Sequence, residues 1–475
     1  MSESEIDLPG APPGAPPGSL PEGRMDEDDR LKPEYVTEVM ERVEAGDADG
    51  ARALVEPLHP ADLADLFELI DSDDRRALAA AIADLLDGDV LAEMNEHVRE
   101  ELIDALDPRQ VADLAGEMET DDAVAMIEDL EEDEQRAVLR ELDPDDRAAI
   151  EEALTYPEES AGRLMQRDLI AVPEHWTVGQ VIDYLRAGED LTTDFWEVFV
   201  VDGRHHPVGT CMLSWILRTH RHVAVADVMK REQTLIPVDM DQEEVALRFQ
   251  KYALISAAVI DQSNRLVGMI TVDDIVHIIQ EEASEDVLLL SGAGEGDINQ
   301  PLLESYSSRV RWLIANLGTA LVAATIIGLF EGTISKMVAL AALMPIVAGV
   351  GGNAGTQTLA VTVRALATNQ LTQSNTWRAI LREIQVACLN GITVAAVIGV
   401  GVGLFFANPA LGGVIAAAML ANIIIAGFAG VLVPLALERA GADPAVASSV
   451  FVTMVTDSMG FLVFLGLATA SGIAG

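Results

Sequence analysis

The chain has 475 residues, of which 50% are hydrophobic, and its formal net charge is −48. This length allows two or more domains, and the acidic excess disfavours nucleic-acid binding because no basic patch could meet phosphates. Residues 1–305 carry 73 of the 78 acidic residues and 23 of the 30 basic ones. An acidic soluble half therefore precedes an apolar half that begins at Tyr306.

Most of the surface acids have an ordinary interpretation. Only four lysines occur in the chain, and acidic excess with scarce lysine is typical of a high-salt cytoplasm, where screening removes self-repulsion. Cys211 and Cys388 lie in different halves, so no disulfide framework is predicted. The N-terminus has neither a basic start nor an apolar run, and we expect no cleaved signal peptide.

Residues 1–30 are rich in Pro and Gly and are predicted to be a disordered tail. Residues 31–158 are predicted to form a helical domain. Three related pieces begin LHPADLADLFEL, LDPRQVADLAGEM and LDPDDRAAIEEAL, and each places Pro or Asp near a helix start before apolar residues at i, i+3 and i+4. We expect short helices stacked in a small superhelical array.

A second repeat occupies residues 159–280. LMQRDLIAVPEHWTVGQVIDYL matches VMKREQTLIPVDMDQEEVALRF at an offset of 64, and FVVDGRHHPVGTCMLSWI matches AVIDQSNRLVGMITVDDI at an offset of 59. Each unit reads as strand, helix, strand, turn, strand and helix. The repeat is similar to a tandem pair of CBS modules, 159–223 and 224–280, which implies an α/β fold. CBS pairs often bind adenine nucleotides but many bind nothing, so ATP is one candidate ligand of this pair and the resemblance does not identify the ligand.

Five long apolar segments follow in residues 306–475, at roughly 309–330, 336–363, 383–407, 411–437 and 445–471. Each can cross a hydrocarbon core of about 30 Å, so an all-α membrane domain in contact with lipid is predicted. Lys336 is alone on one side of the predicted membrane, and the other side has six arginines: Arg309, Arg311 and, in the loops after the second and fourth spans, Arg364, Arg378, Arg382 and Arg439. This bias predicts a cytoplasmic N-terminal half and a C-terminus outside the cell membrane.

The stretch PIVAGVGGNAGTQT, residues 345–358, contains the G-x-G-x-x-A spacing of a dinucleotide-binding loop. Such a loop needs a preceding strand, a soluble sheet and an acid about 20 residues later, whereas position 369 is Asn and the glycines lie in a predicted span. The cofactor interpretation is therefore rejected. We expect close helix packing through Gly351 and Gly355, together with pore lining by Asn353 and Gln357.

Asp457 lies near the middle of the fifth apolar segment. A carboxylate at that depth costs several kcal/mol unless it is solvated, protonated or metal-bound, and no Lys, Arg or His lies in the spans away from their ends. An ion pathway is therefore the leading interpretation. All eight histidines lie in the soluble half, so oxygen ligands are expected, and carboxylates with amides and water suit a hard cation such as Mg²⁺.

The chain resembles the MgtE magnesium channels over nearly its full length after the tail. The matching stretches are YPEESAGRLM (156–165), VDMDQEEV (238–245), ITVDDI (270–275), EEASEDVLLL (281–290), GVGGNAGTQT (349–358), VRALAT (363–368) and DPAVASSVFVTMVTDSMGFL (443–462). The resemblance implies a homodimer, a pore on its two-fold axis, and closure by cytoplasmic Mg²⁺ acting through a connecting helix at 281–305.

The resemblance also assigns residues. Asp457 matches the pore aspartate, Asn353 lies in the glycine–Asn segment, and Asp443 matches an acid that faces the cytoplasmic side. Two departures, Ala253 where Asp is frequent and His277 where an acid is expected, predict fewer or weaker cytoplasmic sites. The cytoplasmic metal contacts implied by the match are Asp241, Glu243, Asp274, Glu282, Glu285 and Asp286.

Two other functions fit parts of the sequence. A channel for Mn²⁺ or Co²⁺ would use the same carboxylate and amide ligands. A membrane-anchored CBS nucleotide sensor would leave Asp457 and Asn353 without a role. An enzyme is not expected, because no phosphate loop, nucleophile–base pair or metal-hydrolase motif is found.

Overall fold

The computed structural model describes residues 24–27, 30–187, 195–291, 299–371, 374–446 and 448–473. The chain divides into two compact units, residues 1–275 and 276–475. Most of the predicted tail, residues 1–30, lies outside the described residues, so that expectation stays a prediction.

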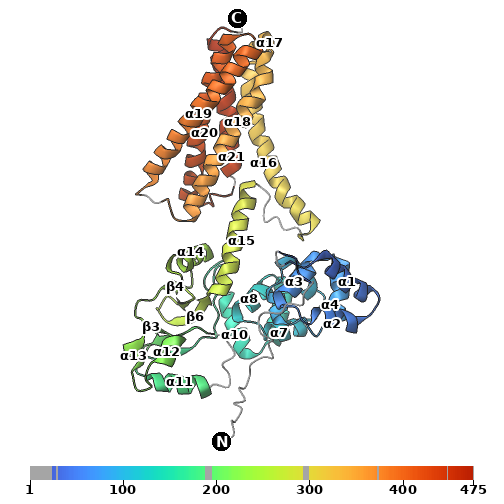
Figure 1. Ribbon diagram of the computed structural model, residues 1–475, viewed down its shortest axis with the longest axis vertical. Coiled ribbons are helices and arrows are strands. Elements are labelled where there is room, and N and C mark those ends of the chain that lie inside the picture. The colour runs from blue at the N-terminus through green and yellow to red at the C-terminus, as the bar shows by residue number, and fades with distance from the viewer. Residues whose placement is uncertain are drawn as a thin grey trace. The chain divides into compact units, whose positions relative to one another are not determined.

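Short α-helices fill residues 33–153, as the repeats led by Pro and Asp predict (Figure 1). Pro60, Pro108 and Pro144 each lie in the first turn of a helix, where the N–H that proline lacks is not needed. Asp107 and Gln110 form a capping box at the start of one of them. The helices are α1 (Pro33–Glu44), α2 (Ala48–Val55), α3 (Pro60–Leu69), α4 (Ser72–Ala81), α5 (Gly88–Ala92), α6 (Glu96–Ile103), α7 (Pro108–Ala115), α8 (Thr120–Glu128), α9 (Glu132–Glu141) and α10 (Pro144–Ala153).

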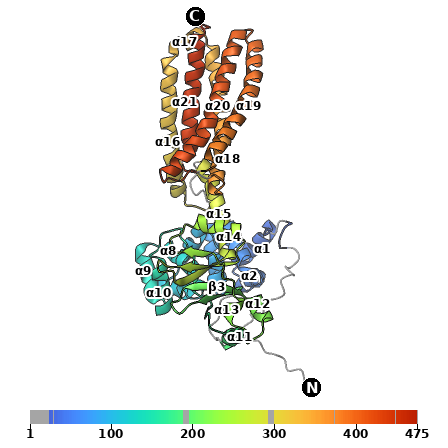
Figure 2. The same cartoon turned by 90° about the vertical axis from the view of Figure 1, so that its left-hand side faces the viewer.

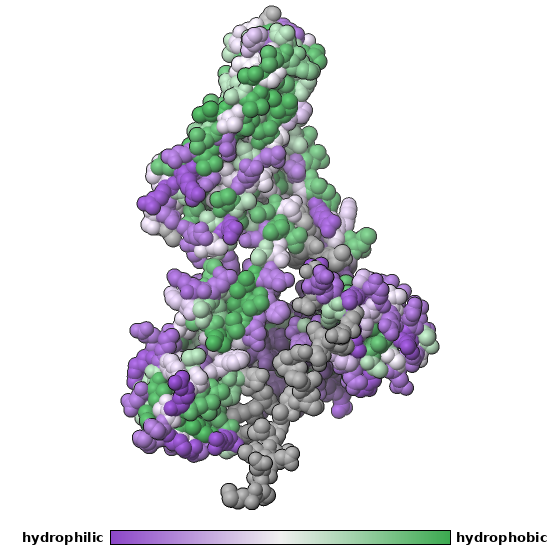
Figure 3. Space-filling model, viewed as in Figure 1, coloured by the Kyte–Doolittle hydropathy of each residue, from purple (hydrophilic) through white to green (hydrophobic). Residues whose placement is uncertain are grey.

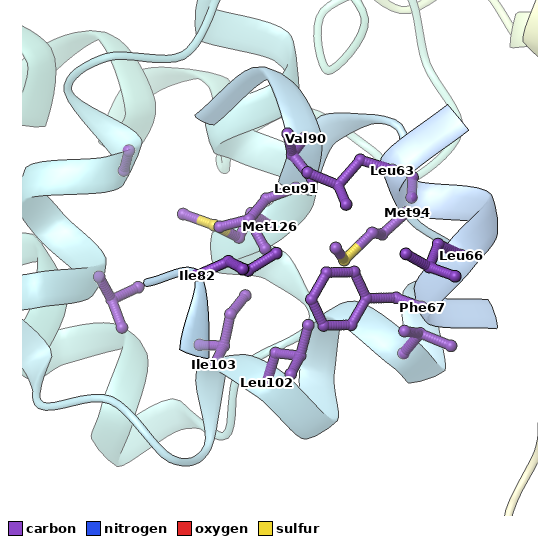
Figure 4. Packing of buried hydrophobic residues seen from close by; sticks show 14 of the residues in the cluster. Leu63, Leu66, Phe67, Ile82, Val90, Leu91, Met94, Leu102, Ile103 and Met126 are labelled. Carbon is purple, nitrogen blue, oxygen red and sulfur yellow. The ribbon is translucent and has the colours of Figure 1, made fainter. Parts of the chain in front are cut away.

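These helices share one apolar core. Figure 4 shows Phe67 of α3 directed toward Leu102 and Met94, with Ile82 and Met126 close by. Phe67, Ile82 and Met126 have no exposed surface. Because residues from α3 to α8 belong to the same cluster, the short helices form a single domain rather than separate pairs.

Two three-stranded sheets follow, and they confirm the second repeat (Figure 2). In each sheet the first strand is parallel to the second and the second is antiparallel to the third. Each second strand has a register irregularity near its end, at Val200/Val201 and at Val259/Ile260, which are 59 residues apart as the repeat predicts. The elements are β1 (Ala171–Pro173), α11 (Val178–Ala187), β2 (Glu197–Val201), β3 (Pro207–Met212), α12 (Leu213–Arg218), α13 (Val225–Val228), β4 (Leu235–Pro237), α14 (Gln242–Tyr252), β5 (Ser256–Ile260) and β6 (Leu266–Thr271).

The helix after β6 includes the first part of the connecting helix expected at 281–305. Helix α15 (Val272–Ser291) starts within the second CBS module and ends at Ser291, and α16 (Leu302–Leu329) begins after Pro301. Proline favours the start of a new helix because it has no N–H to continue an existing one. The second half of α15 therefore covers the first part of the predicted segment, residues 292–298 lie outside the described residues, and the bounds 281–305 stay a prediction.

Five helices in residues 302–470 are long and apolar enough to cross a membrane, which confirms the predicted number of spans. Helix α20 packs against α18, α19 and α21, and α16 packs against α21. In Figure 3, hydrophobic residues cover much of the visible outer face of these helices. The spans are α16, α18 (Ala339–Ala367), α19 (Thr376–Phe405), α20 (Pro409–Arg439) and α21 (Ser448–Ala470), with the short α17 (Glu331–Lys336) between the first two.

The arginines that were expected in loops lie in helices. Arg364 is in the last turns of α18, Arg378 and Arg382 are in the first turns of α19, and Arg439 ends α20. The helices extend beyond the apolar segments because charged end residues are compatible with helix once they reach the interface. The residues still mark one end of the bundle, so the bias that predicts orientation is unchanged.

The helical domain offers a test of its core. Replacing Phe67 by Ala should lower the free energy of unfolding of this domain by about 3–5 kcal/mol, because a buried ring is lost and a cavity remains. Leu69→Ala on the same helix is the control, since Leu69 is 61% exposed. Urea unfolding of the purified protein, followed by circular dichroism, measures both. Equal midpoints for the two variants would contradict the core assignment.

Candidate metal centres

Helix α18 has a packed face and an open face. Gly351 and Gly355 are buried, and a Cβ at Gly355 would lie 2.6 Å from Val452 Cγ1 of α21, closer than any real contact. Asn353 and Gln357 lie on the opposite face and are exposed. The structure therefore confirms helix packing through the glycines and places both amides outside the bundle formed by a single chain.

Asp457 lies on α21 at the level of Asn353. Gly355 of α18 lies against Val452 and Thr456 of α21. One turn earlier in α18, Gly351 lies against the Asn422 side chain, and so does Gly460, one turn after Thr456 in α21. The two helices are thus antiparallel, and Asn353, between the two glycines, lies level with the part of α21 that contains Asp457. Asp457 is half-buried, and α21 carries no Lys, Arg or His. A carboxylate and an amide therefore share one depth on neighbouring helices.

A second pair of predicted residues meets at one end of the membrane domain. Burial, and then the nearby Asp443 carboxylate, raise the pKa of Asp286 in α15. Leu289 and Leu290, at the end of α15, pack against the cluster that contains Leu359 and Val452. Asp443 itself lies five residues before α21 and accepts the N–H of Ala445 at 2.8 Å, so it caps a turn and does not open the helix as the Asp-Pro pattern predicted.

A third group of acids lies in the soluble unit. Ligand oxygens of Glu119, Asp121 and Asp274 all lie within 4.8 Å of one another. Glu119 and Asp121 come from the start of α8, and Asp274 comes from the first turn of α15. Gln166 Nε2 donates to Glu119 Oε2 and lies 3.5 Å from Asp274 Oδ2. Three carboxylates from two domains thus converge, which is the ligand chemistry of a hard divalent cation.

Electrostatics in this group disfavour full ionisation without a cation. Burial, and then the charge of Asp274, raise the pKa of Glu119 to about 7 and that of Asp122 to about 6. Asp121 is 8% exposed, and the same two causes raise its pKa well above the usual value. Among the described residues, its Oδ1 is buried without a hydrogen-bond partner. A divalent ion at this place would replace the protons and satisfy that oxygen.

The remaining predicted residues are spread over α14 and α15. Asp241 is exposed and caps α14, where its Oδ1 accepts the N–H of Glu243 at 3.0 Å. Glu282 and Glu285 lie on α15, one turn before and beside Asp286. Asp241, Glu243, Glu282 and Glu285 are outside the three-acid group found in the described ranges.

The two departures from the family pattern have different settings. Ala253 ends α14 with a left-handed φ of 49°, a conformation that Asp or Asn adopts more readily than Ala. His277 is exposed on α15, one turn after Asp273 and Asp274. Neither position adds a carboxylate, so the prediction of fewer cytoplasmic sites stands as a prediction.

Three acids and two amides were missed from the sequence. Glu119, Asp121 and Asp122 read as ordinary first-turn acids of a helix, where negative charge is favourable in any case. No pattern in the sequence around Gln166 indicates its contact with these acids. Asn422 of α20 was also missed, although it interrupts an otherwise apolar segment and is fully buried.

Comparison with known proteins gives the same domain order. The MgtE divalent cation transporter model matches residues 344–467, the MgtE intracellular N domain model matches 58–159, and the CBS domain model matches 225–281. The magnesium transporter MgtE of Enterococcus faecalis is 33% identical over 319 residues, which are 67% of this chain and 70% of that protein. The magnesium transporter MgtE of Bacillus subtilis is 29% identical over 423 residues, which are 88% of this chain and 93% of that protein.

A solved structure, the cytosolic domain of the Mg²⁺ channel MgtE in complex with ATP, is 27% identical to this chain. It covers 51% of this chain and 99% of its own length, with a TM-score of 0.48.

The three-acid group predicts a dependence of stability on pH. Because folding raises the pKa of Glu119 above its usual value, the folded soluble domain should lose stability as the pH rises from about 4.5 to about 7 in the absence of divalent ions. Millimolar Mg²⁺ at pH 7.5 should restore it, since the ion replaces the proton. Glu119→Gln should raise the unfolding temperature at pH 7.5 without Mg²⁺ by about 2–4 °C and reduce the gain from Mg²⁺.

The matched control is Asp73→Asn, whose side chain is 96% exposed. Thermal scans of the full chain in detergent with EDTA and a fixed KCl concentration measure the effect. If the Glu119 and Asp73 variants respond alike to pH and Mg²⁺, the group does not hold a cation.

Proposed function

Because the chain belongs to the MgtE family of divalent cation transporters, we propose that it is a passive, Mg²⁺-selective channel that cytoplasmic Mg²⁺ closes. The observation that carries the proposal is the exposed amide face of α18 at the level of Asp457 in α21. Polar groups at that depth cannot face lipid tails, because hydrocarbon offers them no hydrogen bonds. They must face water and ions inside a protein-lined path.

A second copy of the chain would form that path. Asn353, Thr356 and Gln357 are exposed on one face of α18, and a lone chain would present them to lipid. A homodimer that buries this face would place two Asp457 carboxylates across its axis. Two negative charges would attract a hydrated divalent ion without removing its water, which suits Mg²⁺ because Mg²⁺ gives up water reluctantly.

The ligand set supports Mg²⁺ as the conducted ion. Carboxylate and amide oxygens line the proposed path, and the eight histidines lie before residue 278, outside the five spans. Mn²⁺ and Co²⁺ also accept oxygen ligands, but they bind more tightly than Mg²⁺ where nitrogen or sulfur is present. Selectivity for Mg²⁺ would then arise from keeping the ion hydrated at Asp457.

Acidic sites at both ends of α15 support closure by cytoplasmic Mg²⁺. Asp274, at its start, belongs to the three-acid group with two residues of α8. Asp286, near its end, lies beside Asp443 of the membrane domain. An ion at either site would bridge acids that otherwise repel, so Mg²⁺ would favour a state in which α15 is held at both ends. A change from mostly open to mostly closed needs about 5.5 kcal/mol, which several weak sites together can supply.

We propose that the soluble half lies in the cytoplasm and the C-terminus outside, and the arginines at one end of the spans support this orientation. Binding of ATP to the CBS pair stays a prediction, and equilibrium dialysis with the purified chain measures it.

Flux and its dependence on Asp457 test the proposed function in one experiment. At an inside-negative potential of about 100 mV, Mg²⁺ gains roughly 4.6 kcal/mol on entry, so proteoliposomes should take it up without ATP or a proton gradient. Asp457→Ala should abolish uptake while leaving folding intact, and Asp457→Asn should leave weak or unselective flux. Glu438→Gln, which lies at the end of α20, is the control and should conduct normally.

Uptake that requires ATP or a proton gradient would overturn the passive channel. Mg²⁺ uptake by Asp457→Ala at the parental rate would overturn the pore assignment. Faster uptake of Mn²⁺ or Co²⁺ than of Mg²⁺ would retain the pore and change its ion.

Closure is tested by proteolysis of the segment 275–305. In a fixed high concentration of KCl, millimolar Mg²⁺ should protect this segment, because bridging needs a divalent ion whereas screening does not. Protection should disappear in a triple variant with Ala at Glu282, Glu285 and Asp286. A triple Ala variant of Glu34, Glu41 and Glu44 in α1 is the control and should stay protected. Equal cleavage of this segment with and without Mg²⁺ would refute closure by Mg²⁺. The acids of α15 would then be an ordinary solvated surface.

A further inference from the structure

Asn422, in the middle of α20, is a buried polar residue that the proposed ion path does not use. Its side chain is fully buried, and its Nδ2 donates to the carbonyl of Val347 in α18 at 3.0 Å. Its Oδ1 is buried without a hydrogen-bond partner among the described residues. An amide with an unpaired acceptor is a poor choice for packing alone, because an apolar side chain has no polar group to desolvate.

Two glycines make the space that this amide occupies. A Cβ at Gly351 of α18 would lie 2.1 Å from Asn422 Nδ2. A Cβ at Gly460 of α21 would lie 2.7 Å from the same nitrogen and 3.0 Å from Oδ1. The amide therefore lies between α18 and α21, and neither helix could slide or rotate past it without a collision.

Both glycines adjoin the residues of the proposed path. Asn353 is two residues after Gly351, and Asp457 is three residues before Gly460. The contact of Gly355 with Val452 and Thr456 is the next one along the same pair of helices. Two contacts therefore set the depth at which Asn353 and Asp457 lie. One is the packing of Asn422 between the two glycines, and the other is the contact of Gly355 with α21.

We infer that Asn422 is a positioning residue, which fixes the register of α18 against α21 and thereby sets the ion selectivity of the path without touching the ion. This inference rests on the proposed function. A shift of about 1 Å between groups that must act together can change their effect by about 100-fold. Loss of the amide should therefore change the apparent affinity and the selectivity more than the maximal rate.

The test compares Mg²⁺ flux into proteoliposomes for the parent and for variants of Asn422 and of the glycine that it contacts, Gly351. Asn422→Leu keeps the branching at Cγ and removes the hydrogen bond. It should raise the half-saturating Mg²⁺ concentration about tenfold and reduce the preference for Mg²⁺ over Mn²⁺. Its unfolding temperature in detergent should not fall, since an unpaired polar group has been removed. That combination separates positioning from a purely structural role.

Glycine variants provide the matched control. Gly351→Ala should reproduce the Asn422→Leu change, because its Cβ would collide with the amide. Gly401→Ala, at an exposed position of α19, should behave as the parent, since a Cβ there has no neighbour within 4 Å. The double variant Gly351→Ala, Asn422→Ala should have the same half-saturating Mg²⁺ concentration as Asn422→Ala alone, because the collision between the new Cβ and the amide no longer occurs.

Parental affinity and selectivity in Asn422→Leu, or equal effects of Gly351→Ala and Gly401→Ala, would overturn the inference while the proposed function stands. A parent that conducts no divalent cation would overturn both. If Asn422→Leu does not fold, the two glycine variants still decide between the outcomes.

Discussion

Hydrocarbon cannot solvate a carboxylate or an amide, and this constraint determines how the membrane domain has to be built. Asp457 and Asn353 lie at one depth on neighbouring helices, and the Asn353 face of α18 is open in a single chain. Lipid cannot solvate that face, and in the proposed function a second copy, water and an ion complete it. The small residues of α18 serve the same end, because they let α20 and α21 approach closely enough to hold the polar groups in place.

In the soluble half, the corresponding constraint is the electrostatic repulsion between neighbouring carboxylates. A large acidic excess is a property of the whole surface and identifies no site by itself. The group formed by Glu119, Asp121 and Asp274 differs because burial adds to repulsion and raises the pKa values. Asp286 beside Asp443 repeats the arrangement at the other end of α15. Both places would gain stability from a divalent ion.

Elements with a strong local pattern could be predicted from the sequence. The predictions of the CBS repeat, the five spans and the close packing at the glycines were correct. Each depends on a pattern within the sequence itself: the offset between repeated segments, the hydropathy of long segments, and the spacing of the glycines. Glu119 and Asp121 could not be linked to Asp274, about 150 residues later, since only folding brings α8 to the start of α15. Asn422 was missed for the same reason.

The central claim is that two Asp457 carboxylates hold a hydrated divalent ion on the axis of a dimer. Anomalous scattering from crystals of the full chain grown with Mn²⁺, a close substitute for Mg²⁺, locates such an ion directly. The account predicts a peak on the two-fold axis between the two Asp457 side chains, separated from them by water, with the Asn353 faces of α18 buried between the copies. Lipid against those faces and no peak at Asp457 would contradict it.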